Sequence, residues 1–245
     1  MDKIQTLTSC PVLFQDEWLI LVDKPAGVLS HPNTDRQKKG GTSSRAAFEG
    51  TYDVEKRCFK TPAGMIWLIH RLDQDTSGVL LAARDAATAA KCRTAFEAGE
   101  IRKNYTVLVL GRLPASDVWK DHLAVGRKAR FVRTVVLTGK RPNALLRYRI
   151  AAYYPASRLS LLEIELVTGK THQIRVQAAF RGYPVVGDDV YGNFAFNKKL
   201  RREINLRRLF LHASMMEIQH PVTGETLRVE SPLPEALQQS LKQLH

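Results

Sequence analysis

The sequence predicts a single domain of the α+β class over residues 1–245, with a mixed, mainly antiparallel sheet and flanking helices. Short apolar runs of strand character outnumber helical segments along the chain. Gly, Pro and Asn turns separate most neighbouring runs, which is typical of an antiparallel meander. The 245 residues, 44% of them hydrophobic, suffice to bury a full core.

The N-terminal third should begin with a hairpin over residues 12–22, which turns at Gln15-Asp16-Glu17. Residues 33–64 are polar and rich in Gly, Ser and Lys, so we expect a surface excursion within the domain. The apolar runs at 65–69 and 79–83 indicate two strands of a buried sheet.

Helix and strand signals continue along the rest of the chain. Asp85 is a good N-cap for a helix that runs to about Ala98 and stops at Gly99. Strands are predicted at 102–111, 144–153, 158–167, 208–219 and 225–230, the last two as a hairpin. Helices are predicted at 171–181, closed by Gly182, and at about 232–244.

The net charge of +13 is unevenly distributed. Residues 121–150 hold eight bases and one acid, and residues 197–210 hold six bases and one acid. A solvated basic face would explain this pattern, but clustered bases also mark surfaces that bind phosphates, and we favour a nucleic-acid partner. Phosphate contacts carry no sequence information, so the charge does not say which nucleic acid is bound.

Other features narrow the class of protein. Cys10, Cys58 and Cys92 are odd in number and far apart, which indicates reduced structural thiols rather than disulfides or a metal clip. No apolar run approaches the roughly 18 residues of a membrane span, and the N-terminus lacks a signal-peptide core. We expect a cytoplasmic protein that acts as a monomer, without a membrane partner.

Residues 70–78 place carboxylates and a guanidinium on a tight turn between two apolar strands. Their sequence, HRLDxxTSG, resembles the active-site motif of the RluA-type pseudouridine synthases. Further patterns of that family follow in its order between residues 14 and 224, and several ordered motifs are more specific than one. They are Lys24-Pro25-Ala26-Gly27-Val28 with His31-Pro32, Lys103-Asn104-Tyr105, Thr168 to Val176, Pro184 to Asp188 with Tyr191-Gly192, Leu211-His212-Ala213 and His220 to Gly224.

Some positions depart from the family pattern. Gln177 stands where the family usually has His, and Phe180-Arg181-Gly182-Tyr183 replaces the commoner His-Leu-Gly-His. No RNA-binding module precedes Val12, so the chain is similar to the compact branch with one catalytic domain. His70 favours this family over the related RsuA type, whose motif begins with Gly.

The resemblance implies a pseudouridine synthase catalytic core that isomerises specific uridines in structured RNA, either ribosomal or transfer RNA. It assigns catalysis to Asp73, which acts as a nucleophile or as a base, and the sequence leaves both routes open. Arg175 is implied to pair with Asp73, Tyr105 to stack on the target base, and Arg71 to fill the space that the flipped-out base leaves. The reaction neither adds nor removes atoms, so we expect no cofactor and no metal.

Elementary chemistry agrees with these roles. A carboxylate in a dry pocket gains a proton unless a cation holds it ionised, and a guanidinium also fixes its orientation. Taken singly, Asp73 would be a turn residue, Tyr105 a core aromatic and Arg175 a surface base. His70, His172 and His212 are interpreted as structural and Asp75 as a turn residue. The segment that begins at Asp73 also resembles a calcium-binding loop, but Arg84 stands where such a loop needs a bidentate Glu, so a calcium site is excluded.

Two other functions fit a basic surface. One is an RNA-binding or RNA-folding protein without catalysis, and the other is a hydrolase that cleaves a glycosidic bond with paired carboxylates. The products distinguish the three functions, because a hydrolase releases free uracil, a binder leaves RNA unchanged and a synthase isomerises uridine without a change of mass.

Overall fold

The computed structural model describes residues 8–32, 45–62, 64–128 and 131–245. The chain divides into two compact units, and each is presented by itself. Unit 1 comprises the described residues within 1–101 and 215–232, and unit 2 comprises those within 102–214 and 233–245. No helix in these described ranges is long and apolar enough to cross a membrane.

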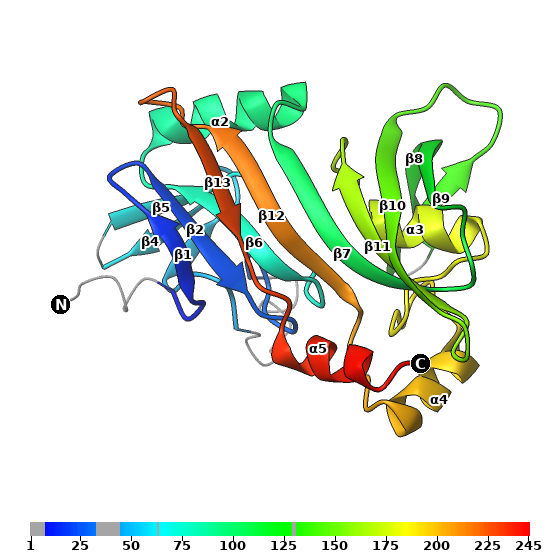
Figure 1. Cartoon of the computed structure of the whole chain (residues 1–245). Helices are drawn as coiled ribbons and strands as arrows, with labels where there is room; N and C mark the ends of the chain where they lie inside the picture. The colour runs from blue at the N-terminus through cyan, green and yellow to red at the C-terminus, as the bar shows by residue number, and fades with distance from the viewer. Residues whose placement is uncertain (1–7, 33–44, 63, 129–130) are drawn as a thin grey trace. The chain divides into compact units, whose positions relative to one another are not determined.

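Unit 1 is built on antiparallel strand pairs (Figure 1). Its central pair joins β2 to β6, with Leu21 opposite Leu81. All seven residues of β6 are buried, because apolar side chains cover both faces of this strand. The strands are β1 (Val12–Gln15), β2 (Leu19–Lys24), β3 (Thr51–Asp53), β4 (Cys58–Thr61), β5 (Gly64–Leu68), β6 (Ser77–Ala83), the end of β12 (Leu211–Gln219) and β13 (Thr226–Glu230).

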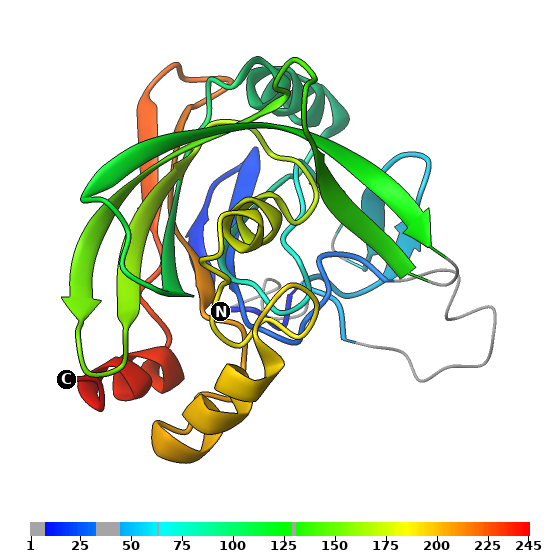
Figure 2. The same cartoon turned by 90° about the vertical axis from the view of Figure 1, so that its right-hand side faces the viewer.

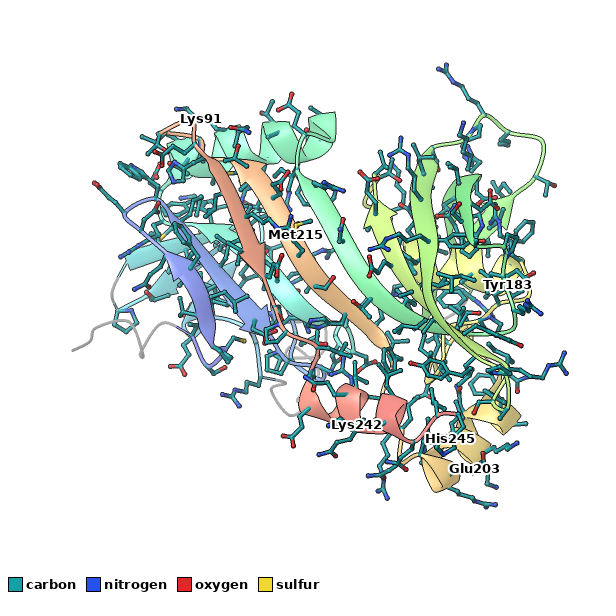
Figure 3. All side chains as sticks on the ribbon, viewed as in Figure 1. Lys91, Tyr183, Glu203, Met215, Lys242 and His245 are labelled. Atoms are coloured by element: carbon teal, nitrogen blue, oxygen red, sulfur yellow. The ribbon has the colours of Figure 1, made fainter. Side chains whose placement is uncertain are left out.

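Helix α2 (Ala86–Ala98) completes unit 1, and its ends follow the capping rules. The Asp85 side chain accepts a hydrogen bond from the Thr88 N–H, and Gly99 ends the helix in the left-handed conformation with φ 77°. Ala89 and Cys92 pack into the core with Leu81. Lys91 reaches the hairpin turn that follows β12, where its Nζ donates to the Pro221 carbonyl at 3.2 Å (Figure 3).

The segment expected to be a surface excursion contributes to the core of unit 1. Its residues 33–44 and 63 lie outside the described residues. The rest forms strands β3 and β4, and Phe48 and Phe59 are almost fully buried, with 2% and 0% of their surface exposed. The polar composition therefore hid a short hairpin that buries only a few large side chains.

Unit 2 contains a curved antiparallel set of long strands. In order of pairing they are β7 (Arg102–Leu110), β11 (Leu159–Leu166), β10 (Ala144–Tyr154), β8 (Ser116–Lys128) and β9 (Phe131–Leu137). Helix α3 (Gln173–Phe180) lies on the concave side of β8 to β10 (Figure 2). Helices α4 (Phe194–Glu203) and α5 (Glu235–Lys242) share a second core that includes Leu200 and Leu237.

The predicted α+β class is confirmed, because antiparallel strand pairs dominate and four helices accompany them in the described residues. An isolated parallel bridge joins Leu29 to Ala46 outside the named strands. The helix predicted over 171–181 begins two residues later, because His172 adopts a left-handed conformation with φ 55°. That the whole chain forms one catalytic domain stays a prediction.

Candidate active site

The loop 70–76 joins β5 to β6 in unit 1 and carries Arg71 and Asp73. The Asp73 carbonyl oxygen accepts a hydrogen bond from the Thr76 N–H at 3.1 Å, which closes a tight turn. The Asp73 side chain is half-buried, and Arg71 is exposed. A turn thus holds the backbone beneath the Asp73 carboxylate while water still reaches the residue.

Ser30 fixes the residue between them. Its hydroxyl donates to the Leu72 carbonyl at 2.9 Å and accepts from the Leu72 N–H at 3.0 Å. Both groups are buried, so these bonds replace water for a stretch of backbone that forms no strand here. The segment that follows the Lys24 motif therefore positions the loop that carries Asp73.

Lys24 also joins its own segment, residues 24–30, to the 70–76 loop. Its side chain is fully buried, and its Nζ donates to the carbonyls of Pro25, Val28 and Gln74 at 2.9, 2.7 and 3.0 Å. An ammonium has three N–H donors, so three carbonyls match its hydrogen-bonding capacity. The Gly27 N–H adds a fourth bond to the Gln74 carbonyl at 2.8 Å.

His70 supports the loop from the core side. Its Nε2 accepts a hydrogen bond from the Leu81 N–H at 3.1 Å, and its ring stacks on Phe96 at 5.2 Å between centroids. This arrangement agrees with the structural role expected for His70, because the ring links the loop to both β6 and α2.

Tyr105 lies on β7 in unit 2, opposite Ile164 of β11. The residue is buried, with 7% of its surface exposed, and Lys103 lies on the same face two residues earlier. Burial lowers the pKa of Lys103 to about 8. The Lys-x-Tyr motif therefore presents an aromatic ring and a desolvated amine side by side on one strand face.

Arg175 lies in the first turn of α3 and is buried. Its Nε and Nη2 donate to the two carboxylate oxygens of Asp188 at 2.7 and 2.9 Å, a bidentate pair. Burial alone would raise the pKa of Asp188, but the hydrogen bonds and charge of Arg175, with the Tyr191 and Val190 N–H groups, outweigh it and lower that pKa. Asp188 is thus an ionised anchor for Arg175.

Asn197 of α4 secures the Asp188 segment. Its side-chain oxygen accepts from the Gly187 N–H at 2.9 Å, and its nitrogen donates to the Asp188 carbonyl at 3.0 Å. Gly187 has φ 75°, and a β-carbon there would collide with the Arg208 carbonyl. Asn197 is therefore two hydrogen-bonded steps from the Arg175 guanidinium.

Tyr191 covers the guanidinium. The Cζ of Arg175 lies 5.4 Å from the centroid of the Tyr191 ring, and the Cζ of Arg133 lies 5.2 Å from it. The phenol oxygen lies 3.0 Å from His172 Nδ1 and accepts from the Thr134 N–H at 3.0 Å. These contacts join α3, β9 and the Asp188 segment around Arg175.

Two of the positions that depart from the family pattern contact one carboxylate. Gln177 donates to Asp121 through Nε2, and Arg181 donates to both Asp121 oxygens at 2.8 and 3.2 Å. Arg181 also lies over the Trp119 ring, with Cζ 4.8 Å from its centroid. Both departures therefore belong to one network between α3 and β8.

The structure places the four predicted site residues in two pairs. Arg71 and Asp73 share the 70–76 loop of unit 1, and Tyr105 and Arg175 belong to unit 2. Arg175 is bound to Asp188, a residue the sequence argument quoted in a motif without giving it a role. The pairing of Asp73 with Arg175 stays a prediction.

Lys24, Ser30 and Asn197 had no predicted role. Lys24 and Ser30 bond to residues 50 and 42 positions away in the chain, and Asn197 bonds to Asp188, nine positions away. The one signal in the sequence was that Lys24 lies within a motif that matches the family pattern.

Comparisons with known proteins agree on one family. The family model described as RNA pseudouridylate synthase matches residues 18–180. Ribosomal large subunit pseudouridine synthase C of Yersinia pestis is 33% identical over 98% of this chain and 71% of its own length. tRNA pseudouridine synthase C of Salmonella typhimurium is 33% identical over 95% of this chain and 88% of its own length.

A solved structure extends the likeness to the fold. Human RNA pseudouridylate synthase domain containing 4 has a TM-score of 0.68 and covers 95% of this chain and 92% of its own, at 22% identity. Together with the family model and the relatives, this confirms the resemblance found in the motifs. The chain belongs to the RNA pseudouridylate synthase family, of the RluA type, and is an isomerase that converts uridine to pseudouridine in RNA.

Proposed function

We propose that this enzyme isomerises specific uridines of structured ribosomal or transfer RNA, with Asp73 as the reacting carboxylate and a flipped-out base as substrate. The observation that carries the proposal is the way Ser30 and Lys24 hold the loop of a half-buried Asp73 by three hydrogen bonds, all to backbone groups of Leu72 and Gln74. Such preorganisation suits a group that must meet a substrate atom in a defined orientation.

The reaction breaks the bond between N1 of uracil and C1′ of ribose, and it forms a bond between C5 of uracil and the same C1′. C5 loses a proton and N1 carries one in the product, so the atoms balance without a co-reactant. Asp73 takes part either by attacking the nucleoside covalently or by removing a ribose proton. Both routes require an ionised carboxylate.

Arg175 is the residue that we propose keeps Asp73 ionised and oriented. At about 4 Å, their attraction is roughly 4 kcal/mol at an effective dielectric of 20, before desolvation is subtracted. The bidentate Asp188 pair supports this role, because it fixes the guanidinium plane before RNA binds.

Tyr105 would bind the target base, and Arg71 would fill the space that the base leaves. The Tyr105 ring would stack on the face of the uracil while the base turns. The hydroxyl of the same residue would assist proton removal. Flipping a base out of folded RNA costs a few kcal/mol, and an inserted side chain offsets part of that cost. The exposed position of Arg71, two residues before Asp73, supports its assignment as that side chain.

The two basic stretches, 121–150 and 197–210, would bind RNA phosphates. In the first, Arg147 and Arg149 are paired across the strands with Glu165 and Glu163. In the second, α4 carries four exposed cations, of which Lys199 has a distant pair with Glu203 at 3.8 Å. These α4 cations are Lys198, Lys199, Arg201 and Arg202.

The relatives suggest the RNA classes to test. Two of them are named for large-subunit ribosomal RNA and for tRNA, and we propose one of these classes as the substrate. Action in the cytoplasm and as a monomer stays a prediction.

The deciding experiment maps pseudouridine in cellular RNA after incubation with wild type, Asp73→Asn and Asp53→Asn. Asp73→Asn should lower conversion by about 100- to 10,000-fold, because it removes the nucleophile or base. Asp53→Asn makes the same chemical change on β3, outside the loop, and should convert at the wild-type rate.

The same reaction tests the two other functions. Free uracil in the supernatant would identify a hydrolase, and an unchanged map with retained RNA binding would identify a silent binder. Equal maps from wild type and Asp73→Asn would contradict the assignment of Asp73. A positive map also names the substrate RNA and the modified position.

A further inference from the structure

A column of rings in unit 1 leads from the core to Arg71. Phe48 and Phe59 form its buried base, with ring centroids 5.7 Å apart. Tyr52 packs on Phe59 at 4.8 Å, and His31 stacks on Tyr52 at 4.8 Å with an interplanar angle of 11°. The Arg71 Nη1 lies 3.1 Å from His31 Nε2, so an exposed guanidinium is attached to the outer end of this column.

These contacts fix the proton position on His31. A guanidinium only donates hydrogen bonds, so His31 Nε2 must accept and carries no proton. Nδ1 lies 3.0 Å from the Pro32 carbonyl, which only accepts, so Nδ1 carries the proton. Both bonds therefore require the neutral imidazole in its Nδ1–H tautomer.

The surroundings of His31 favour this neutral form. Burial lowers the pKa of His31, and the nearby charges of Arg71 and Arg57 lower it further, whereas the bond to the Pro32 carbonyl opposes them. Tyr52 is the other titratable group that faces the ring, and burial raises its pKa, which keeps it a neutral phenol. Among the described residues, the charged groups that act on the His31 ring are therefore the cations Arg71 and Arg57.

The segment that contains His31 also holds the backbone next to Arg71. Ser30 fixes Leu72 through both its N–H and its carbonyl, and the next residue, His31, fixes the Arg71 side chain. One short segment thus sets both the main chain beside Asp73 and the direction of the guanidinium before it.

We propose that His31 is a positioning residue, which holds Arg71 in the orientation needed to enter the space left by the flipped base. This inference rests on the proposed function of Arg71. Protonation of His31 removes the acceptor and places a cation against the guanidinium, so Arg71 is released in acid. Activity on folded RNA should therefore decline as the pH falls below about 6.5 through a group other than Asp73.

The first test does not depend on activity. Long-range proton–nitrogen NMR spectra of the 15N-labelled protein reveal the tautomer of each imidazole, and the His31 signals are those missing from His31→Gln. The expected result is an Nδ1–H tautomer whose pKa lies below that of a free histidine and rises in Arg71→Ala. An Nε2–H tautomer, or a pKa unmoved by Arg71→Ala, would overturn the proposal.

The second test compares kcat and KM on folded RNA for wild type, His31→Ala, Arg71→Ala and the double variant. If His31 acts through Arg71, His31→Ala lowers kcat/KM about as much as Arg71→Ala, and the double variant is no worse than Arg71→Ala. Multiplied losses in the double variant would contradict the proposal.

His31→Gln separates positioning from packing. The glutamine oxygen can accept from Arg71 near the place of Nε2 but does not titrate, so this variant should retain activity at pH 7.5 and lose less than wild type at pH 5.5. An acid decline shared by wild type and His31→Gln would overturn the inference. A wild type that converts no RNA would instead contradict the proposed function, and the NMR result would still decide the link between His31 and Arg71.

Discussion

Asp188 binds Arg175 through two parallel hydrogen bonds of 2.7 and 2.9 Å, inside a segment that Asn197 holds in place. The two units thus carry carboxylates of different kinds. Asp73 is half-buried on a loop, and Asp188 is fully buried and fixed. The second carboxylate gives the first prediction.

Asp188→Asn should destabilise the protein by about 3 to 5 kcal/mol, because it leaves a buried guanidinium without its counter-charge. It should also lower pseudouridine formation, since Arg175 loses its orientation. Urea unfolding gives the first quantity and the RNA map the second. Asp189→Asn, a change at the exposed neighbouring residue, is the matched control and should alter neither.

The same pair predicts a pH dependence. Because the pKa of Asp188 is lowered in the folded protein, its stabilising effect is complete above the ordinary value of 3.8 and is lost as the pH falls through the folded value. The difference in unfolding free energy between wild type and Asp188→Asn should be constant above about pH 5 and shrink below pH 3.8. A constant difference down to pH 2 would mean that Asp188 is not an ionised anchor.

Lys24→Met should destabilise unit 1 by about 3 kcal/mol, because three carbonyls lose the charged donor that a fully buried lysine supplies. Lys24→Arg should not restore stability, since a planar guanidinium cannot aim its donors at three carbonyls arranged around one ammonium. Lys60→Met removes an exposed lysine whose pair with Asp53 is 3.8 Å long, and should change stability by less than about 1 kcal/mol. Equal unfolding midpoints for the two Met variants would contradict the role given to Lys24.

Replacing the four α4 cations with Gln should weaken RNA binding and reduce the slope of log affinity against log salt by roughly 3, if each cation contacts a phosphate. Filter binding over a salt series measures both quantities. A matched variant replaces four exposed cations of unit 1, and it should keep the wild-type slope. Those residues are Lys56, Lys60, Lys91 and Arg228.

The cysteine thiols should be unreactive until the protein unfolds. All three are free and buried, and burial raises the pKa of Cys92 to about 11, so at pH 8 only about one thiol in a thousand is ionised there. A disulfide reagent at pH 8 should label none of them within minutes in the native protein and three in urea. Rapid labelling of the native protein would show that a thiol is accessible and activated.

Local rules predicted the elements that carry local signals. Helix α2 has Asp85 as its cap and Gly99 as its stop, and the hairpin of β12 and β13 has turn residues between apolar runs. Helix α4 was missed because its sequence is polar and only Asn197 and Leu200 are buried on it. Its Asn193 cap was a usable signal, but the charge of the segment drew the interpretation toward RNA binding alone.

The candidate site residues could be named from the sequence, but the contacts they make could not. Family motifs named Asp73, Arg71, Tyr105 and Arg175, whereas the bonds from Lys24 to Gln74 and from Arg175 to Asp188 arise only when distant segments meet. The proton position on His31 similarly depends on a partner 40 residues away. Long-range polar contacts have no period in the sequence, so pattern analysis does not detect them.

The two faces of helix α4 differ. Its cations are exposed to solvent, whereas Asn197 is buried and hydrogen-bonded to the Asp188 segment. Exchanging this helix to redirect the enzyme to another RNA would therefore also disturb the ion pair between Arg175 and Asp188. Such a graft should retain asparagine at position 197 and glycine at position 187, and vary only the outward-facing positions.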